Sequence, residues 1–159
     1  MYYRHSGRPA SPPLARTRAE SNRLEFKGLV ESGELTGLIG YRGEVPVGWI
    51  SLGPREVYKK LERSPVMKPV DGKPVWSIIC FVVPAPYRGQ GVARALLDGA
   101  IAYAKKRGVR LLEAYPVDKR GRSNDDTMWF GAKSMFDAAG FEEVARRKPN
   151  RPVVRLRPV

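Results

Sequence analysis

The longest apolar run in the chain lies at its centre and covers Val75–Val83. It contains β-branched and aromatic residues and only one strongly polar position, Ser77. A strand that is apolar in both alternating registers is typical of a sheet covered on both faces. The run therefore predicts a buried central strand.

A helical pattern follows this strand, from about Gly91 to Lys106. Its apolar positions recur at helical spacing on one face. Arg107-Gly108 ends the helix with a basic last turn and a glycine cap. The next apolar stretch, Val109–Tyr115, follows after a very short connection. A right-handed crossover would then place it parallel to the Val75–Val83 strand.

The rest of the chain predicts further helices and strands around this unit. Apolar periodicity, turn residues and glycine or proline positions define them. The expected elements are a helix over Leu14–Val30, a hairpin of Leu35–Tyr41 and Val45–Leu52, a short helix over Pro54–Glu62, a loop over Ser64–Pro74, a charged loop over Asp118–Asp126, a helix over Met128–Ala139, and two strands over Phe141–Arg147 and Val153–Leu156. Together they predict a mixed α/β domain over residues 14–159, preceded by a flexible arm over residues 1–13.

Composition limits the chemistry that this domain can carry. The 159 residues fit one domain, and the net charge of +13 favours anionic partners. Cys80 and His5 are the only residues of their kinds, which excludes an internal disulfide, a multi-cysteine zinc site and a Ser-His-Asp triad built on a domain histidine. We expect no metal and no membrane partner, and a reducing, cytoplasmic setting fits the cysteine content.

The loop between the central strand and the helix carries the binding argument. It reads Arg88-Gly89-Gln90-Gly91-Val92-Ala93. The first amides of a helix lack internal partners, glycine lets a phosphate approach the backbone, and arginine adds a permanent cation. A Walker sequence would need Gly-Lys-Ser/Thr, and a dinucleotide fingerprint would need glycine where Arg94 stands.

This loop resembles the Gln/Arg-x-x-Gly-x-Gly/Ala signature of the GNAT superfamily of N-acetyltransferases. Val83-Pro84 before the loop, Ala95-Leu96-Leu97 after it, and the distal Ala138-Ala139-Gly140-Phe141 are similar to residues at the same places in that family. The resemblance spans roughly Gly37 to Leu156. It implies a central mixed sheet, flanked by helices and splayed at the strands that bind coenzyme A.

The resemblance also implies a co-substrate and a reaction. Acetyl-CoA would place its pyrophosphate on Arg88, Gly89, Gln90, Gly91, Val92 and Ala93, and its pantetheine arm along Phe81, Val82 and Val83. The chain would then be an acyltransferase that moves an acetyl group to an amine of a small molecule or a protein. It looks like a bacterial subgroup without an assigned substrate, and a homodimer is a common arrangement for such proteins.

The catalytic groups depart from the family's usual pattern. Ser77 stands where many members have a glutamate base, and Phe136 stands where many have a tyrosine acid. Tyr115 and Glu113 are the alternatives, because strand alternation places both on one face. Ser77 could hold a water molecule, whereas Asp118 and Cys80 are weaker candidates for a carboxylate base and a nucleophile.

Two other functions compete with catalysis. A non-catalytic acyl-CoA-binding or sensing module would explain the missing acid and base. A nucleic-acid partner is suggested only by the net charge, since the chain has neither a helix-turn-helix signal nor an aromatic RNA-binding strand motif.

Overall fold

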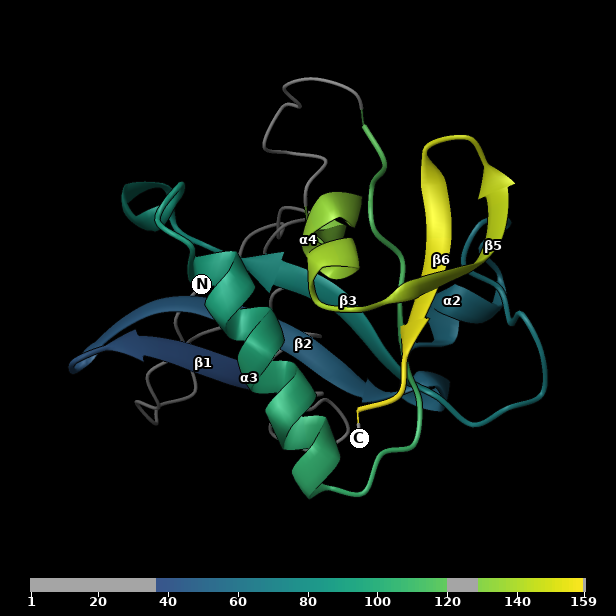
Figure 1. Cartoon of the computed structure of the whole chain (residues 1–159), viewed down its shortest axis with the longest axis horizontal. Coiled ribbons are helices and arrows are strands. Elements are labelled where there is room, and N and C mark those ends of the chain that lie inside the picture. Colours follow the sequence, from purple (N-terminus) through teal and green to yellow (C-terminus); the bar gives the residue numbers. More distant parts are fainter. Residues whose placement is uncertain (1–36, 120–128, 159) are drawn as a thin grey trace, which may run out of the picture.

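A mixed sheet with the strand order β1-β2-β3-β4-β6-β5 organises the molecule (Figure 1). The computed structural model describes residues 37–119 and 129–158. The strands are β1 (Gly37–Arg42), β2 (Val45–Pro54), β3 (Trp76–Val82), β4 (Leu112–Ala114), β5 (Glu142–Lys148) and β6 (Arg151–Leu156). Only β3 and β4 are parallel neighbours, and the other neighbouring strands are antiparallel. The predicted parallel pairing of β3 and β4 is therefore confirmed.

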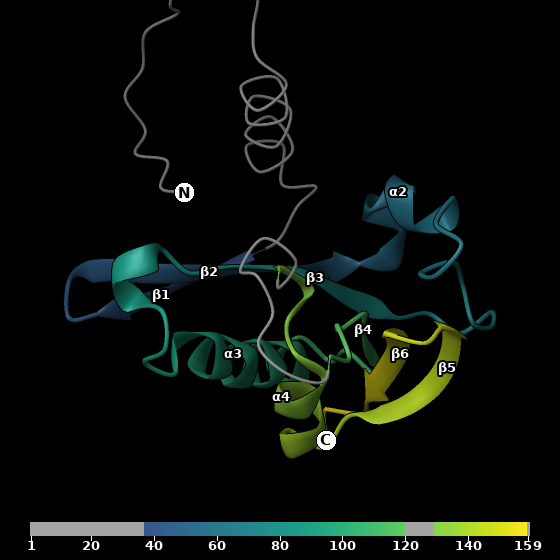
Figure 2. The ribbon, with the colours of Figure 1, turned by 90° about the horizontal axis from the view of Figure 1, so that it is seen from above.

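Helices lie on both sides of the sheet. In Figure 2, α3 (Val92–Lys106) and α4 (Lys133–Ala138) lie on one side, and α2 (Lys59–Glu62) lies on the other. Two single-turn 3₁₀ helices complete the described elements, η1 (Arg55–Val57) after β2 and η2 (Ala85–Tyr87) after β3. The mixed α/β architecture expected from the sequence is confirmed. No helix in the described ranges is long and apolar enough to span a membrane.

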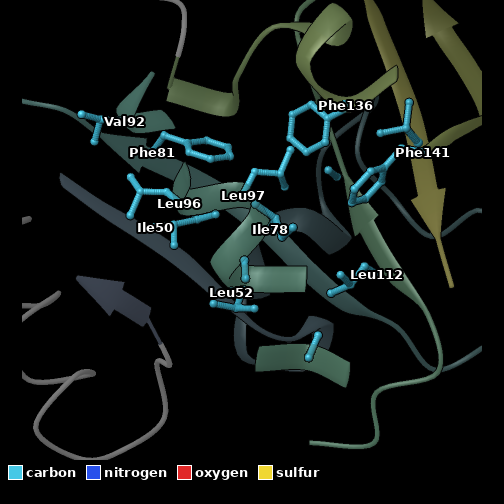
Figure 3. Packing of buried hydrophobic residues seen from close by; sticks show 14 of the residues in the cluster. Ile50, Leu52, Ile78, Phe81, Val92, Leu96, Leu97, Leu112, Phe136 and Phe141 are labelled. Atoms are coloured by element: carbon cyan, nitrogen blue, oxygen red, sulfur yellow. The ribbon is translucent and has the colours of Figure 1, made fainter. Parts of the chain in front are cut away.

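The main core fills the space between the sheet and α3 and α4 (Figure 3). Leu97 of α3 is fully buried against the sheet, together with Ile50 of β2 and Ile78 of β3. A smaller cluster on the α2 side contains Tyr58, Leu61, Tyr115 and Val153, and Ile79 packs against it. Because Ile78 and Ile79 enter different cores, β3 is covered on both faces, as its apolar run predicts.

Several predicted boundaries are wrong. The helix expected from Met128 begins at Lys133, because Gly131 has a φ of 82° that no right-handed helix accepts. The Pro54–Glu62 helix is divided into η1 and α2, and the strand expected at Val153 already begins at Arg151. The arm over residues 1–13 and the Leu14–Val30 helix lie outside the described residues.

Candidate active site

The two parallel strands separate soon after they meet. β3 pairs with β4 only from Trp76 to Ile78, opposite Leu112 to Ala114. Beyond Ile78, β3 continues to Val82 with β2 as its strand partner. Among the described strands, none pairs with the other edge of Ile79–Val82. An extended ligand could therefore add its own hydrogen bonds to this edge, as an extra strand would.

A β-bulge lies where the strands separate. Ile78 and Cys80 pair with the consecutive residues Leu52 and Ser51, so Ile79 is an additional residue in β3. A bulge resets the alternation of side chains and increases the local twist. Consequently Ile78 and Phe81, three residues apart, both enter the core beneath α3. The bulge and the separation together open the sheet at one defined place.

The loop after β3 leads directly to the N-terminus of α3. Gly91 is the N-cap residue with a φ of 79°, and Gly89 has a φ of 71°. No side chain caps the helix, and a Cβ added at either glycine would meet open space. The first-turn amides are thus exposed at the positive end of a 15-residue helix. This geometry fits a diphosphate group.

Side-chain hydrogen bonds hold the loop in this shape. The Nε of Arg88 donates to the carbonyl of Val83 at 2.9 Å, and the Nε2 of Gln90 donates to the carbonyl of Pro86 at 2.9 Å. Arg42, at the end of β1, donates to the Oε1 of Gln90 at 2.8 Å. Sequence reasoning missed Arg42, because only the fold brings it to a loop 48 residues away.

The predicted catalytic candidates form one hydrogen-bonded group on the α2 side of the sheet. The hydroxyl of Tyr115 donates to the Oε1 of Glu113 at 2.7 Å and lies 2.8 Å from the Oγ of Ser77. All three residues are at most 1% exposed. The sequence placed Glu113 and Tyr115 on one face, and the structure brings Ser77 of the neighbouring strand to the same point. Their catalytic roles stay predictions.

Two arginines that the sequence analysis did not single out surround Glu113. Arg55 donates to the Oε1 of Glu113 at 2.9 Å and to the hydroxyl of Tyr115 at 2.6 Å. Arg155 donates to the Oε2 of Glu113 at 2.7 Å, and its other nitrogens bind both carboxylate oxygens of Asp71 at 2.7 and 3.0 Å. A buried carboxylate needs such partners to offset its desolvation. We name this set the Glu113 network: Ser77, Tyr115, Arg55, Glu113, Arg155 and Asp71.

Burial determines the protonation of the side chains near the bulge. Burial, and then the charge of Glu113, raises the pKa of Tyr115 far above its ordinary value, so its hydroxyl keeps its proton at neutral pH. Burial raises the pKa of Cys80 to about 11, which leaves a protonated and weakly nucleophilic thiol. Tyr115 is therefore a hydrogen-bond donor at neutral pH and not a base.

Two other positions considered for catalysis, Phe136 and Asp118, make contacts within the fold. Phe136 is fully buried and meets Phe81 and Phe141 edge to face, with ring centroids 6.0 and 5.1 Å away. Asp118 forms an ion pair with Arg146 at 2.8 Å.

The basic strands β5 and β6 lie at the opposite end of the molecule from η2 and its loop (Figure 2). Contact between these strands and the phosphates of a coenzyme A bound at the Arg88–Ala93 loop does not fit this arrangement.

A sheet that separates at a bulge, next to an open helix N-terminus, is typical of proteins that bind acyl-CoA by strand addition. Residues 4–123 match the model of the acetyltransferase (GNAT) family. The match covers most of the chain, so this chain belongs to the GNAT acetyltransferase family. Membership confirms the predicted enzyme class, an acyltransferase with acetyl-CoA as co-substrate. No curated protein sequence matches the chain.

Solved structures agree with this fold. A protein assigned to the GNAT family from Desulfovibrio desulfuricans aligns with a TM-score of 0.58 and 17% identity over 90% of this chain and 84% of its own. An N-acetyltransferase from Staphylococcus aureus aligns at 0.55 with 16% identity, over 87% and 77%. PaiA N-acetyltransferase from Thermoplasma acidophilum, solved with coenzyme A, aligns at 0.53 with 14% identity, over 87% and 71%. At these identities the likeness concerns the fold.

The part of the chain that the structure describes contains no set of metal ligands. No group of three or more histidine, cysteine, aspartate or glutamate side chains there could hold a metal ion. The candidate site consists of backbone amides, hydroxyls, one buried carboxylate and guanidinium groups.

Proposed function

We propose that this chain transfers the acetyl group of acetyl-CoA to an amine, with the cofactor bound in the separation between β3 and β4. The observation that carries the proposal is the continuity of two features. The unpaired edge of Ile79–Val82 leads within ten residues to the uncapped N-terminus of α3. Pantetheine amides would pair with this edge along Phe81, Val82 and Val83, and the diphosphate would bind the amides of the Arg88–Ala93 loop.

Bound acetyl-CoA supplies an activated thioester, so the protein has three tasks. It must position the amine, polarise the thioester carbonyl and manage the protons of the amine and the departing thiolate. Backbone N–H groups on the open edge of β3 are fixed donors for the carbonyl. Because they are already oriented, they need no rearrangement during the reaction.

We infer that the Tyr115 hydroxyl, with Ser77 and Glu113, acts on the protons of this reaction. Three observations support the inference. The hydroxyl keeps its proton at neutral pH, it lies beside the strand that separates from β4, and Arg55 and Glu113 fix its orientation. Tyr115 would turn its hydroxyl proton from Glu113 toward the leaving thiolate and regain a proton from the attacking amine, and Ser77 and Glu113 would position it.

A second candidate function is an acyl-CoA sensor without turnover. The full burial of Phe136, together with at most 1% exposure of Ser77, Glu113 and Tyr115, favours it. An assay of thiol release over a panel of small amines and peptides separates the two functions. We expect release of coenzyme A that depends on the amine. Binding of acetyl-CoA with no turnover across the panel would support the sensor.

Arg88→Glu tests the cofactor site. The substitution places a negative charge where a diphosphate should bind, so we expect the Kd of acetyl-CoA to rise by roughly a hundredfold. Arg107→Glu is a matched control, because it makes the same charge change at the C-terminal end of α3. Unchanged calorimetric binding in Arg88→Glu would contradict the proposed site.

We also propose a cellular location for the enzyme. The single cysteine, whose thiol is protonated, is compatible with a reducing bacterial cytoplasm. We likewise keep, as proposals, one catalytic domain over residues 14–159 and a homodimer. Sedimentation of the purified protein would test the homodimer.

A further inference from the structure

A cavity lies beyond the end of β4, on the side of the molecule that carries β5 and β6. Its volume is about 420 Å³. It is bounded by the residues after β4, the residues before α4 and the β5–β6 turn. The lining consists of Val117, Lys119, Trp129, Phe130, Lys148, Asn150 and Arg151. Aromatic rings and cationic side chains thus face one space, and no carboxylate of the described residues contributes to the lining.

Arg151 is the unusual member of this lining. Its Nη2 lies 3.3 Å from the carbonyl oxygen of Tyr115 and 3.7 Å from the Sδ of Met67, and its guanidinium carbon lies 4.4 Å from the centre of the Phe130 ring. Its Nε is buried without a hydrogen-bond partner. Within the described residues, no carboxylate forms an ion pair with it.

The two most buried arginines of the described chain differ in this respect. Arg55 and Arg155 each contact at least one carboxylate within 4 Å, whereas the half-buried Arg147 donates to the backbone carbonyls of Lys68 and Pro69. Burial lowers the pKa of Arg151, and no carboxylate in the described ranges offsets this effect. A desolvated cation without a counter-ion is unfavourable, and a bound anion would relieve it. The nearby ammonium of Lys148, on an exposed residue, adds to the attraction.

The cavity adjoins the proposed site of acetyl transfer. Phe130, one of its walls, packs against the same buried cluster as Ile79, the bulged residue of β3. Arg151 itself contacts the backbone of Tyr115, whose hydroxyl belongs to the Glu113 network. A molecule in this cavity would therefore lie next to the place where β3 and β4 separate.

We propose that this cavity binds the acceptor, and that the acceptor is a small amine with a carboxylate group and an apolar or aromatic body. Arg151 binds the carboxylate through its planar fork of N–H donors, and Trp129 and Phe130 contact the apolar body. This inference rests on the proposed acetyl transfer, because it names the acceptor class for that reaction. Its binding test does not require turnover.

Matched pairs of amines test the carboxylate requirement. L-tryptophan and tryptamine, and L-phenylalanine and phenethylamine, differ within each pair only in the carboxylate. Calorimetry with the coenzyme A-loaded protein should show binding of the carboxylated member at least roughly tenfold tighter than its partner. Equal binding within both pairs, or no binding of either amino acid, would overturn the inference even if other amines are acetylated.

Substitution of Arg151 tests whether this residue binds the carboxylate of the acceptor. In Arg151→Gln, the affinity for the amino acid should fall roughly tenfold, so that the preference within each pair disappears, while the Kd of coenzyme A stays unchanged. Arg157→Gln removes one exposed charge just beyond the same strand and should have no effect. If Arg151→Gln fails to fold, Arg151→Lys carries the test. It keeps the charge but loses the planar fork, and should give a smaller loss.

The outcomes separate this inference from the proposed function. Carboxylate preference that survives in Arg151→Gln would place the anion elsewhere and overturn the inference, with acetyl transfer untouched. Carboxylate-dependent binding with no thiol release would support the acceptor site and contradict catalysis.

Discussion

The two sides of the sheet present different kinds of chemistry. On the side of α3, the residues proposed to bind the cofactor, Phe81–Ala93, are continuous in sequence and exposed in large part, and they would bind it through backbone amides. On the side of α2, the Glu113 network joins residues from Arg55 to Arg155 and is almost wholly buried. One side has an uncapped helix N-terminus that is proposed to bind an anion, and the other has a carboxylate already neutralised by arginines of the protein.

This difference separates the residues expected to bind a ligand from those that stabilise the fold. An open helix N-terminus has no internal partner and gains from a ligand phosphate. Glu113 already has two guanidinium partners and one tyrosine partner, so it holds strands together whether or not a ligand is present. Substitutions on the first side should therefore change affinity, and substitutions on the second side should change stability as well.

The largest expected effect is at Glu113. Glu113→Gln removes the buried carboxylate between Arg55 and Arg155, which keep only the exposed carboxylates of Glu62 and Asp71, and the free energy of unfolding should fall by about 3–5 kcal/mol. Urea unfolding measures it. Glu142→Gln on the exposed strand β5 is the control, with a change within about 0.5 kcal/mol. A loss below 1 kcal/mol at Glu113 would show that the network contributes little support.

Tyr115 should show the next largest effect, on turnover. Tyr115→Phe removes the proposed proton donor, and kcat should fall roughly a hundredfold, as is typical for the loss of an acid or base. Phe136→Leu alters only core packing and should reduce stability by about 1–2 kcal/mol with kcat nearly kept. Steady-state kinetics with acetyl-CoA at saturation compares them. The reverse order would remove Tyr115 from the mechanism.

Asp71 should give a smaller effect that depends on pH. Its hydrogen bonds with Arg155 lower the pKa of the Asp71 carboxyl from 3.8 to about 2. A depressed carboxyl pKa contributes stability above about pH 4, and this contribution is lost as the pH falls toward 2. Asp71→Asn should reduce the slope of Tm against pH in this window. The exposed Asp98→Asn is the control, and an unchanged slope in Asp71→Asn would contradict the pairing.

The smallest effect is expected at Cys80. Its pKa of about 11 keeps the thiol protonated, so alkylation by iodoacetamide at pH 7.5 should be much slower than that of a free cysteine. Cys80→Ala should keep kcat within about threefold, since the thiol is not proposed to react. Rapid alkylation that abolishes activity would return Cys80 to the mechanism.

The sequence predicted the parts that depend on local patterns. The β3 run, the α3 periodicity and the glycine loop are contiguous, so their structures follow from spacing and backbone preferences. Sequence reasoning could not find Arg55, Arg155 or Asp71, because their partners lie tens of residues away and only strand pairing brings them together. The role of Gly131 was missed because it depends on tertiary contacts: a Cβ there would lie 2.9 Å from the Phe136 ring and 3.2 Å from the Phe81 ring.

Cofactor binding gives the most direct test of the account. Calorimetry can compare acetyl-CoA with S-acetylpantetheine, which keeps the thioester arm but lacks the diphosphate and the nucleotide. If the N-terminus of α3 binds the diphosphate, S-acetylpantetheine should bind roughly a hundredfold more weakly, because charge-assisted hydrogen bonds contribute about 1.5–3 kcal/mol each. Equal affinities, or no binding of acetyl-CoA at high micromolar concentration, would contradict the proposed site.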